Sequence, residues 1–212
     1  GVTGVQTCAL PISPLTSIQG WVEMLKESGS NDRIAGEMEK DVQRLKLVSD
    51  RFGKIGSTPQ LELANPVKQV EDMIAYIQKR APSKVNFNLD VQGSSDIPIL
   101  LNPPLFDWVI ENLLKNALDA LEGEGDISIT VKDGAEQVII DVSDTGKGIS
   151  KKHVPLVFKP GFSTKKRGWG LGLSLSRRIM EQYHGGELFV RRSEPGKGST
   201  FRVILRKSPR SN

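Results

Sequence analysis

The chain has 212 residues, a length that fits one large domain or two small ones. Lys and Arg total 29 and Asp and Glu total 25, and the resulting net charge of +4 is too small an excess to indicate a nucleic-acid-binding protein. A single cysteine excludes a disulfide framework and a cysteine-based metal site. No apolar run approaches the roughly 18 residues that a membrane-spanning helix needs.

The first twelve residues differ from the rest of the chain. They show no regular apolar period, no coherent turn chemistry, and neither the charged region nor the apolar core of a signal peptide. We interpret residues 1–12 as the translation of a sequencing adapter joined in frame to a truncated gene. The alternative is an ordinary terminal extension without structure. Cys8 lies in this segment, and we assign it no role.

Residues 13–57 have the pattern of two short helices. Apolar residues recur at steps of three and four before a break at residues 28–32, and beyond the break Met38, Leu45 and Phe52 lie seven apart. Because two such helices bury little surface alone, we expect them to form half of a four-helix bundle that a second copy of the chain completes. The alternative is a helical hairpin packed on its own domain.

From residue 58 to residue 207 the pattern alternates between helices and strands. Asn65 and Asn102 are each followed by proline, a sequence typical of a helix N-terminus. We predict helices over 66–81, 103–121 and 171–183, and strands over 84–91, 126–132, 137–143, 187–192 and 200–206. The fold class is therefore α+β: the helical hairpin, then an α/β sandwich with helices over one face of a mixed sheet. Residues 208–212 are expected to be a disordered tail.

The helix predicted from Pro103 carries three polar side chains on one face. Asn112, Asn116 and Asp119 lie at positions i, i+4 and i+7. Their oxygens suit Mg²⁺, which takes its remaining ligands from water and from nucleotide phosphates. The alternative is a solvated polar stripe, in which Glu111 and Lys115 form a surface ion pair.

Two glycine-rich turns have features of a nucleotide site. Asp144 follows a strand and precedes Gly146 and Gly148, so a carboxylate that could accept from a base amino group lies beside backbone that a ligand can approach. An ordinary β-turn is the alternative. Residues 168–173 precede a helix, and such a turn presents free N–H groups to phosphate, although many helices begin in this way.

A loop of unusual length, residues 146–168, separates these two turns. Loops of this length inside a compact domain are usually lids or binding loops. Its basic run, residues 165–167, could contact a triphosphate. The alternative is a solvated basic surface.

Together, the order and spacing of these motifs resemble the catalytic part of sensor histidine kinases, which belong to the GHKL ATPase superfamily. The resemblance extends from Pro14 to Arg206. The matching segments are 111–119 (the N box), 144–148 (the first glycine box), 158–166 (the F box), 168–173 (the second glycine box) and the closing segments 184–186 and 196–201.

The resemblance implies ATP and Mg²⁺ as cofactors and a role for each matching residue. Asn116 would ligate Mg²⁺, Asn112 would line the phosphate end, and Glu111 would lie near the transferred phosphoryl group. Asp144 would accept from the adenine amino group, with help through water from Thr200. Some relatives have a basic residue in place of Asp119, so its phosphate contact is open. The remaining ATP-binding residues would be Gly146, Gly148, Phe158, Phe162, Ser163, Thr164, Lys165, Gly168, Gly170, Leu171, Gly172 and Leu173.

In this family the γ-phosphoryl group passes to a histidine on the first helix and then to an aspartate of a response regulator receiver domain. Residues 14–18 match the end of the segment that holds this histidine, and the adapter begins where the histidine should lie. His153 and His184 are not on that helix, and His184 could be a residue favoured by the dipole at a helix C-terminus. We therefore expect nucleotide binding and homodimerisation without autophosphorylation.

The resemblance further implies a kinase core that works in the cytoplasm, from a parent that a missing N-terminal region could anchor in the bacterial inner membrane. No nucleic-acid partner is expected. Two other functions fit parts of the pattern. A GHKL anti-sigma serine kinase would lack the two bundle helices, and a non-catalytic nucleotide-binding scaffold would not need to retain Glu111 and Asn116.

Overall fold

The computed structural model describes residues 60–165 and 170–207. The chain divides into two compact units, Gly1–Pro59 and Gln60–Asn212, and all the described residues belong to the second. The predictions for the adapter segment, the helical hairpin, Gly168 and the tail 208–212 fall outside the described residues.

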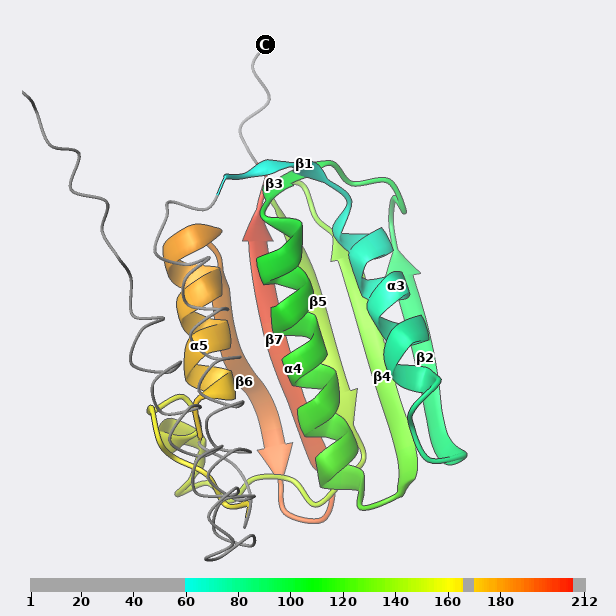
Figure 1. Cartoon of the computed structure of the whole chain (residues 1–212), viewed down its shortest axis with the longest axis vertical. Helices are drawn as coiled ribbons and strands as arrows, with labels where there is room; N and C mark the ends of the chain where they lie inside the picture. The colour runs from blue at the N-terminus through cyan, green and yellow to red at the C-terminus, as the bar shows by residue number, and fades with distance from the viewer. Residues whose placement is uncertain (1–59, 166–169, 208–212) are drawn as a thin grey trace, which may run out of the picture. The chain divides into compact units, whose positions relative to one another are not determined.

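A five-stranded mixed sheet forms the centre of the second unit (Figure 1). Its order is β2 (Lys84–Gln92), β4 (Glu124–Asp133), β5 (Gln137–Asp144), β7 (Gly198–Arg206) and β6 (Glu187–Glu194). The β2–β4 pair is parallel and the other pairs are antiparallel. This sheet confirms the predicted strands and the prediction of a mixed sheet.

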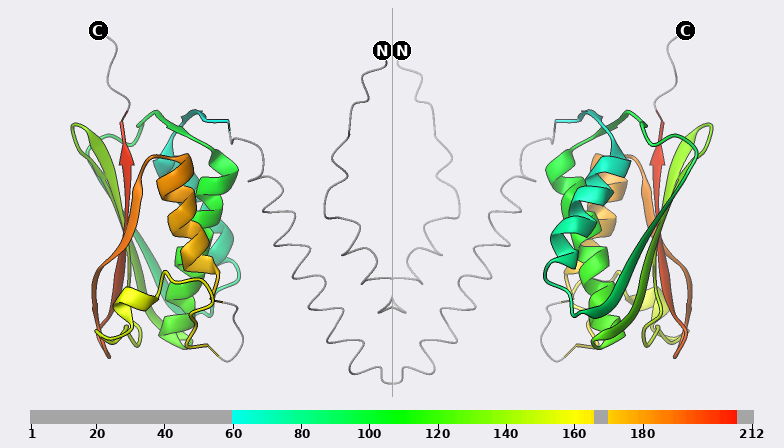
Figure 2. Two further views of the ribbon diagram at one scale, coloured as in Figure 1. Left: turned by 90° about the vertical axis from the view of Figure 1, so that its left-hand side faces the viewer. Right: turned by 90° about the vertical axis from the view of Figure 1, so that its right-hand side faces the viewer.

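Three helices cover one face of the sheet, as Figure 2 shows from two sides. They are α3 (Pro66–Gln78), α4 (Pro103–Leu121) and α5 (Gly172–Arg178), which continues as the π-helical turn Ile179–Tyr183. Alternate residues of the central strands, such as Val138, Ile140 and Val142, are buried under the helices. The predicted sandwich of helices on one side of a sheet is confirmed.

The two predicted asparagine caps begin α3 and α4. The side-chain oxygen of Asn65 accepts from the N–H of Val67 (3.0 Å), and that of Asn102 accepts from the N–H of Leu105 (3.1 Å). Each bond satisfies an N–H group that has no partner inside the helix. These caps fix where the two long helices start.

The structure also contains elements that the sequence patterns did not indicate. β1 (Glu62–Ala64) and β3 (Ile99–Leu101) form a separate antiparallel pair, and a short 3-10 helix spans Val154–Leu156. Three residues are too few for an alternating pattern to identify a strand. β4 and β7 each begin two residues before the predicted start, and α3 ends before the predicted residue 81.

His184 lies at a helix C-terminus, as predicted, where it caps the π-helical turn, but its ring is neutral and is not a cation favoured by the dipole. The side chain is buried, its Nε2 accepts from the N–H of Asn102 (3.1 Å), and its Nδ1 lies 3.1 Å from the carbonyl oxygen of Ile179. Burial lowers the pKa of His184, which favours the neutral ring. The neutral ring therefore joins the start of α4 to the end of the π-helical turn.

Candidate nucleotide-binding site

Helix α4 presents the polar residues of the candidate site from an otherwise buried apolar helix. Asn112 is part-buried, and its Nδ2 donates to Ser176 Oγ of α5 (2.9 Å). The side chain of Asn112 also lies against Gly172, where any Cβ would collide with its amide oxygen. Gly172 therefore lets α5 begin in close contact with the Asn112 amide, and the half-buried Leu171 and Leu173 flank this contact.

The lid segment, which we define as residues 158–165, reaches the same helix. Lys165 Nζ lies 2.8 Å from Asn116 Oδ1 and 2.5 Å from Asp119 Oδ2. These partners are 49 and 46 residues away in the sequence. The fold thus brings together two motifs whose proximity the residue patterns alone could not show.

Aromatic contacts hold the lid segment to the rest of the domain. The Phe158 ring meets the edge of Phe201 (ring centroids 6.3 Å apart), and the guanidinium of Arg177 lies over its face (4.4 Å). Phe162 packs against His153 (5.5 Å). Ser163 and Thr164 are exposed.

The second glycine turn joins the lid segment through backbone contacts. Gly170 has φ +63°, and a Cβ at this position would collide with the backbone at Phe162. The N–H of Gly161 donates to the carbonyl oxygen of Gly170 (3.1 Å). Glycine is needed here because the left-handed conformation and the close backbone approach both exclude a side chain.

Asp144 lies at the end of β5, where its side chain is only 8% exposed. Its Oδ1 accepts from the N–H of Gly146 (2.9 Å), and its carboxylate also bonds to the backbone of Ser199. Burial raises the pKa of Asp144, and these two backbone bonds oppose the rise. A buried carboxylate with free acceptor capacity suits a ligand that donates hydrogen bonds.

Gly146 and Gly148 leave space for the protein's own backbone. A Cβ on Gly146 would collide with Ala120 at the end of α4, and a Cβ on Gly148 would collide with Glu194 at the end of β6. The N–H of Lys147 donates to the carbonyl oxygen of Ala120 (3.0 Å). This packing places the Asp144 turn beside the last turn of α4, which includes Asp119 and Ala120.

Thr200, predicted to assist Asp144 through water, does not lie on the same face of the sheet as Asp144. The cross-strand partner of Asp144 is Ser199, and Thr200 pairs with Ser143. Since successive side chains alternate between the faces of a sheet, Thr200 lies on the opposite face. Its hydroxyl bonds to Ser143 Oγ (2.9 Å) and accepts from Arg192 Nε (3.2 Å). Ser199 is the hydroxyl residue beside Asp144, and only the strand register identifies it.

Glu111 forms the ion pair that the sequence offered as the alternative to a site role. Its carboxylate lies 2.6 Å from Lys115 Nζ, and its side chain is 18% exposed against 56% for Lys115. Glu111 also helps to raise the pKa of Asp107, after the larger effects of burial and of Asp72. An ion pair on the helix surface leaves Glu111 free to exchange partners when a ligand binds.

The oxygen donors on α4 fit a cation. The Lys165 ammonium group already contacts both Asn116 and Asp119, so the structure itself places a positive charge between these two oxygens. Within residues 60–165 and 170–207, no group of three or more His, Cys, Asp or Glu side chains could hold a metal by itself. Mg²⁺ at this position would therefore need further oxygens, such as those of nucleotide phosphates.

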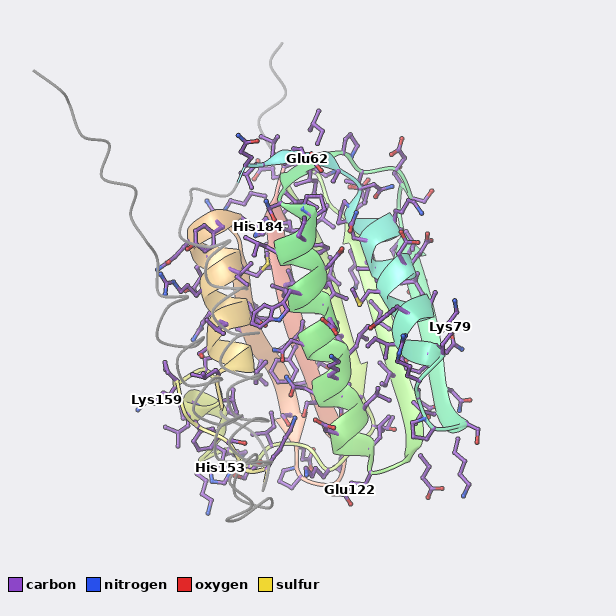
Figure 3. All side chains as sticks on the ribbon, in the orientation of Figure 1. Glu62, Lys79, Glu122, His153, Lys159 and His184 are labelled. Carbon is purple, nitrogen blue, oxygen red and sulfur yellow. The ribbon has the colours of Figure 1, made fainter. Side chains whose placement is uncertain are left out.

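Figure 3 shows the side chains of the domain and the positions of its two histidines. His184 lies toward the end where α4 begins, whereas His153 and Glu122 lie toward the end where α4 finishes (Figure 3). The polar residues of α4, the Asp144 turn and the lid segment thus gather around the C-terminal half of α4.

No described helix is both long and apolar enough to cross a membrane.

Comparison with known proteins agrees with this arrangement. Residues 102–209 match the family model described as histidine kinase-, DNA gyrase B-, and HSP90-like ATPase. Sensor histidine kinase ZraS of Escherichia coli (strain K12) is 32% identical over 209 residues, which cover 93% of this chain and 44% of ZraS. Sporulation kinase C of Bacillus subtilis (strain 168) is 39% identical over 202 residues, covering 91% and 46%.

Solved structures of histidine kinases have a similar fold. The catalytic domain of histidine kinase ThkA has a TM-score of 0.65 and 25% identity, covering 72% of this chain and 99% of that domain. Histidine kinase ThkA in complex with response regulator protein TrrA has a TM-score of 0.66 at 22% identity, covering 95% and 60%. The chain spans less than half the length of the curated relatives named above. The curated relatives named above are a sensor histidine kinase and a sporulation kinase, and this chain belongs to the histidine kinase-, DNA gyrase B- and HSP90-like ATPase family.

Proposed function

We propose that residues 58–207 are the ATP-binding catalytic domain of a two-component sensor histidine kinase. The observation that carries this proposal is the convergence of three separate motifs on the C-terminal half of α4. Asn116 and Asp119 contact Lys165 of the lid segment, and the Asp144 turn packs against Ala120. A site that only positions a nucleotide and neutralises its charge is sufficient for phosphoryl transfer.

In this proposal, each part of the site binds one part of ATP. The buried Asp144 carboxylate accepts from the adenine amino group, beside Ser199, whose hydroxyl bonds to Ser193 Oγ (2.9 Å). Asn116 provides an oxygen for Mg²⁺, while Asn112 lines the phosphate end. Bound Mg²⁺ would supply positive charge that offsets the phosphate oxygens. Glu111 would release Lys115 and contact the acceptor group instead, close to the phosphoryl group that is transferred.

The residues that would flank the phosphates belong to the lid segment and to the start of α5. Lys165 would contact the γ-phosphate, since its ammonium group lies on an exposed segment that faces α4. The backbone around Gly170 and Gly172 would approach the phosphates, and glycine at these positions lets it pack closely on Phe162 and Asn112. The lid segment would therefore provide a mobile charge and α5 a fixed edge.

We infer that neither histidine of this chain is the phosphoacceptor. The chain has two histidines, and His184 is buried in the packing between α4 and the π-helical turn while His153 packs against Phe162. We therefore expect this chain to bind Mg·ATP without phosphorylating itself. Acid-labile label on the protein after incubation with ATP labelled in the γ-phosphate would contradict this expectation.

The partners follow from the same assignment. Residues 13–57 would pair with a second copy to form the bundle, and a response regulator receiver domain would receive the phosphoryl group from the acceptor histidine. The ThkA kinase has been solved with its response regulator, which supports this class of partner. The domain would work in the cytoplasm.

The experiment that tests the function is calorimetric titration of the protein with a non-hydrolysable ATP analogue and Mg²⁺. Asp144→Asn replaces a carboxylate that accepts from adenine by an amide that presents a donor as well. A hydrogen bond to a charged group contributes about 1.5–3 kcal/mol, so we expect affinity to fall by about tenfold or more.

Asp90→Asn is the matched control, because Asp90 is an exposed carboxylate on β2 and bonds only locally to Gln92. Its affinity should equal that of the unmodified protein. Equal affinity for Asp144→Asn would remove the adenine assignment, and no binding by the unmodified protein would remove the proposed function.

A further inference from the structure

The contact between Lys165 and α4 involves the same oxygen that is proposed to ligate Mg²⁺. Lys165 Nζ donates to Asn116 Oδ1 at 2.8 Å and forms an ion pair with Asp119 at 2.5 Å. The distance to Asn116 is ordinary for a charge-assisted hydrogen bond, and the distance to Asp119 is somewhat shorter. The ammonium group therefore takes up part of the cation-binding capacity of this face of α4.

The local structure directs Lys165 toward this position. Its backbone N–H donates to Ser163 Oγ (3.1 Å), so a turn in the lid segment orients the lysine. Lys165 is 37% exposed and Asp119 is 56% exposed, so the pair lies in solvent and can open and close readily. Asp119 is the charged partner, whereas Asn116 contributes a neutral amide.

An ammonium group and a divalent cation cannot share these oxygens at no cost, because two positive charges at such short range repel each other. A nucleotide that brings Mg²⁺ to Asn116 must first move Lys165 away. Once moved, the same lysine is free to meet the phosphates, whose negative charge attracts it. Lys165 therefore competes with Mg²⁺ for the oxygens of α4, but it attracts the phosphates of the nucleotide.

We propose that Lys165 is a tethered cation that occupies the Mg²⁺-ligating face of α4 until Mg·nucleotide displaces it, and that Asp119 is the positioning residue that holds it there. This inference rests on the proposed function, since it concerns the same site. It assigns Asp119 a role toward Lys165 rather than toward phosphate.

The test compares how much Mg²⁺ strengthens ADP binding in the unmodified chain and in Lys165→Met. ADP is the probe because it lacks the γ-phosphate that Lys165 would contact. For each protein, calorimetry gives the Kd for ADP with EDTA and the Kd for Mg·ADP, and their ratio is the Mg²⁺ enhancement. Removing the competing ammonium group should increase this ratio by about 1.4- to 5-fold, the range expected for an exposed ion pair.

Two control variants separate displacement from a general loss of charge. Lys165→Arg keeps the cation and should keep the enhancement of the unmodified chain. Lys152→Met removes another exposed lysine of the same long loop and should also leave the enhancement unchanged. In addition, the side-chain amide resonance of Asn116 in ligand-free protein should shift in Lys165→Met and not in Lys152→Met.

The outcomes distinguish this inference from the proposed function. An unchanged or smaller enhancement in Lys165→Met, in a protein that binds Mg·ADP, would overturn the tethered cation and leave the proposed function intact. An equal increase in Lys152→Met would overturn it as well, because the effect would then be one of general charge. If the unmodified chain bound neither form of ADP, the proposed function would fail and the inference with it.

Discussion

Helix α4 and the lid segment provide two sides of the same candidate site, but the fold holds them by different kinds of interaction. α4 begins at an asparagine cap and buries eight residues, namely Leu105, Phe106, Val109, Ile110, Leu113, Leu114, Ala117 and Leu121. The lid segment has two half-buried phenylalanines, and Lys165 joins it to α4 through exposed contacts with Asn116 and Asp119. The helix is therefore a preformed platform, while the lid segment can exchange its partner at low cost.

This difference matters for how a nucleotide would bind. Buried apolar contacts are lost only by partial unfolding, whereas an exposed ion pair contributes about 1 kcal/mol or less. The donor oxygens of Asn112 and Asn116 can keep their positions while Lys165 moves between them and the phosphates. A rigid side and an exchangeable side are what reversible binding of a charged ligand requires.

The strongest test of the platform is Phe106→Ala. The Phe106 side chain is fully buried, so its removal leaves a cavity in the layer between α4 and the sheet. We expect a loss of about 3–5 kcal/mol in the free energy of unfolding, measured by urea denaturation. Leu63→Ala is the control, because Leu63 is 71% exposed and its truncation should change little. A loss below 1 kcal/mol for Phe106→Ala would contradict the view of α4 as a rigid platform.

The corresponding test of the lid segment is Phe158→Ala. It removes the ring that contacts both Phe201 and the Arg177 guanidinium, and these two contacts together are worth about 1–2.5 kcal/mol. We expect a smaller loss of stability than for Phe106→Ala and faster proteolytic cleavage within residues 158–165. If cleavage instead began in the strands, Phe158 would be part of the core rather than an anchor of the lid segment.

The smallest expected effect is on the pH dependence of stability, through His184, which bonds to the start of α4. Burial lowers the pKa of His184 below its usual 6.5, so the unfolded chain takes up this proton at a higher pH than the folded chain. The contribution of His184 to stability is complete above pH 6.5 and is lost as the pH falls through 6.5 toward the lower folded-state pKa.

The pH test uses His184→Gln, which cannot take up a proton in this range. Urea midpoints measured between pH 8 and pH 5 should fall more steeply for the unmodified chain than for His184→Gln. Parallel curves would show that the ring is not held neutral against Asn102. This effect should leave proteolysis of the lid segment unchanged, because His184 lies at the other end of α4.

Much of this domain follows from short stretches of its sequence. The caps at Asn65 and Asn102, the alternating strands and the order of the glycine-rich motifs each depend on neighbouring residues. Within the described residues the structure confirms α3, α4 and the mixed sheet, and the family model confirms the predicted family. Local backbone preferences and apolar periodicity determine such features before any long-range contact forms.

Other features depend on which distant segments meet, and only the tertiary structure decided them. The pairing of β1 with β3, the choice of Ser199 over Thr200 beside Asp144, and the neutral state of His184 all follow from strand register or burial. The contact of Lys165 with Asn116 and Asp119 joins residues more than forty positions apart. Burial, register and charge pairing are properties of the packed chain, so no local pattern specifies them.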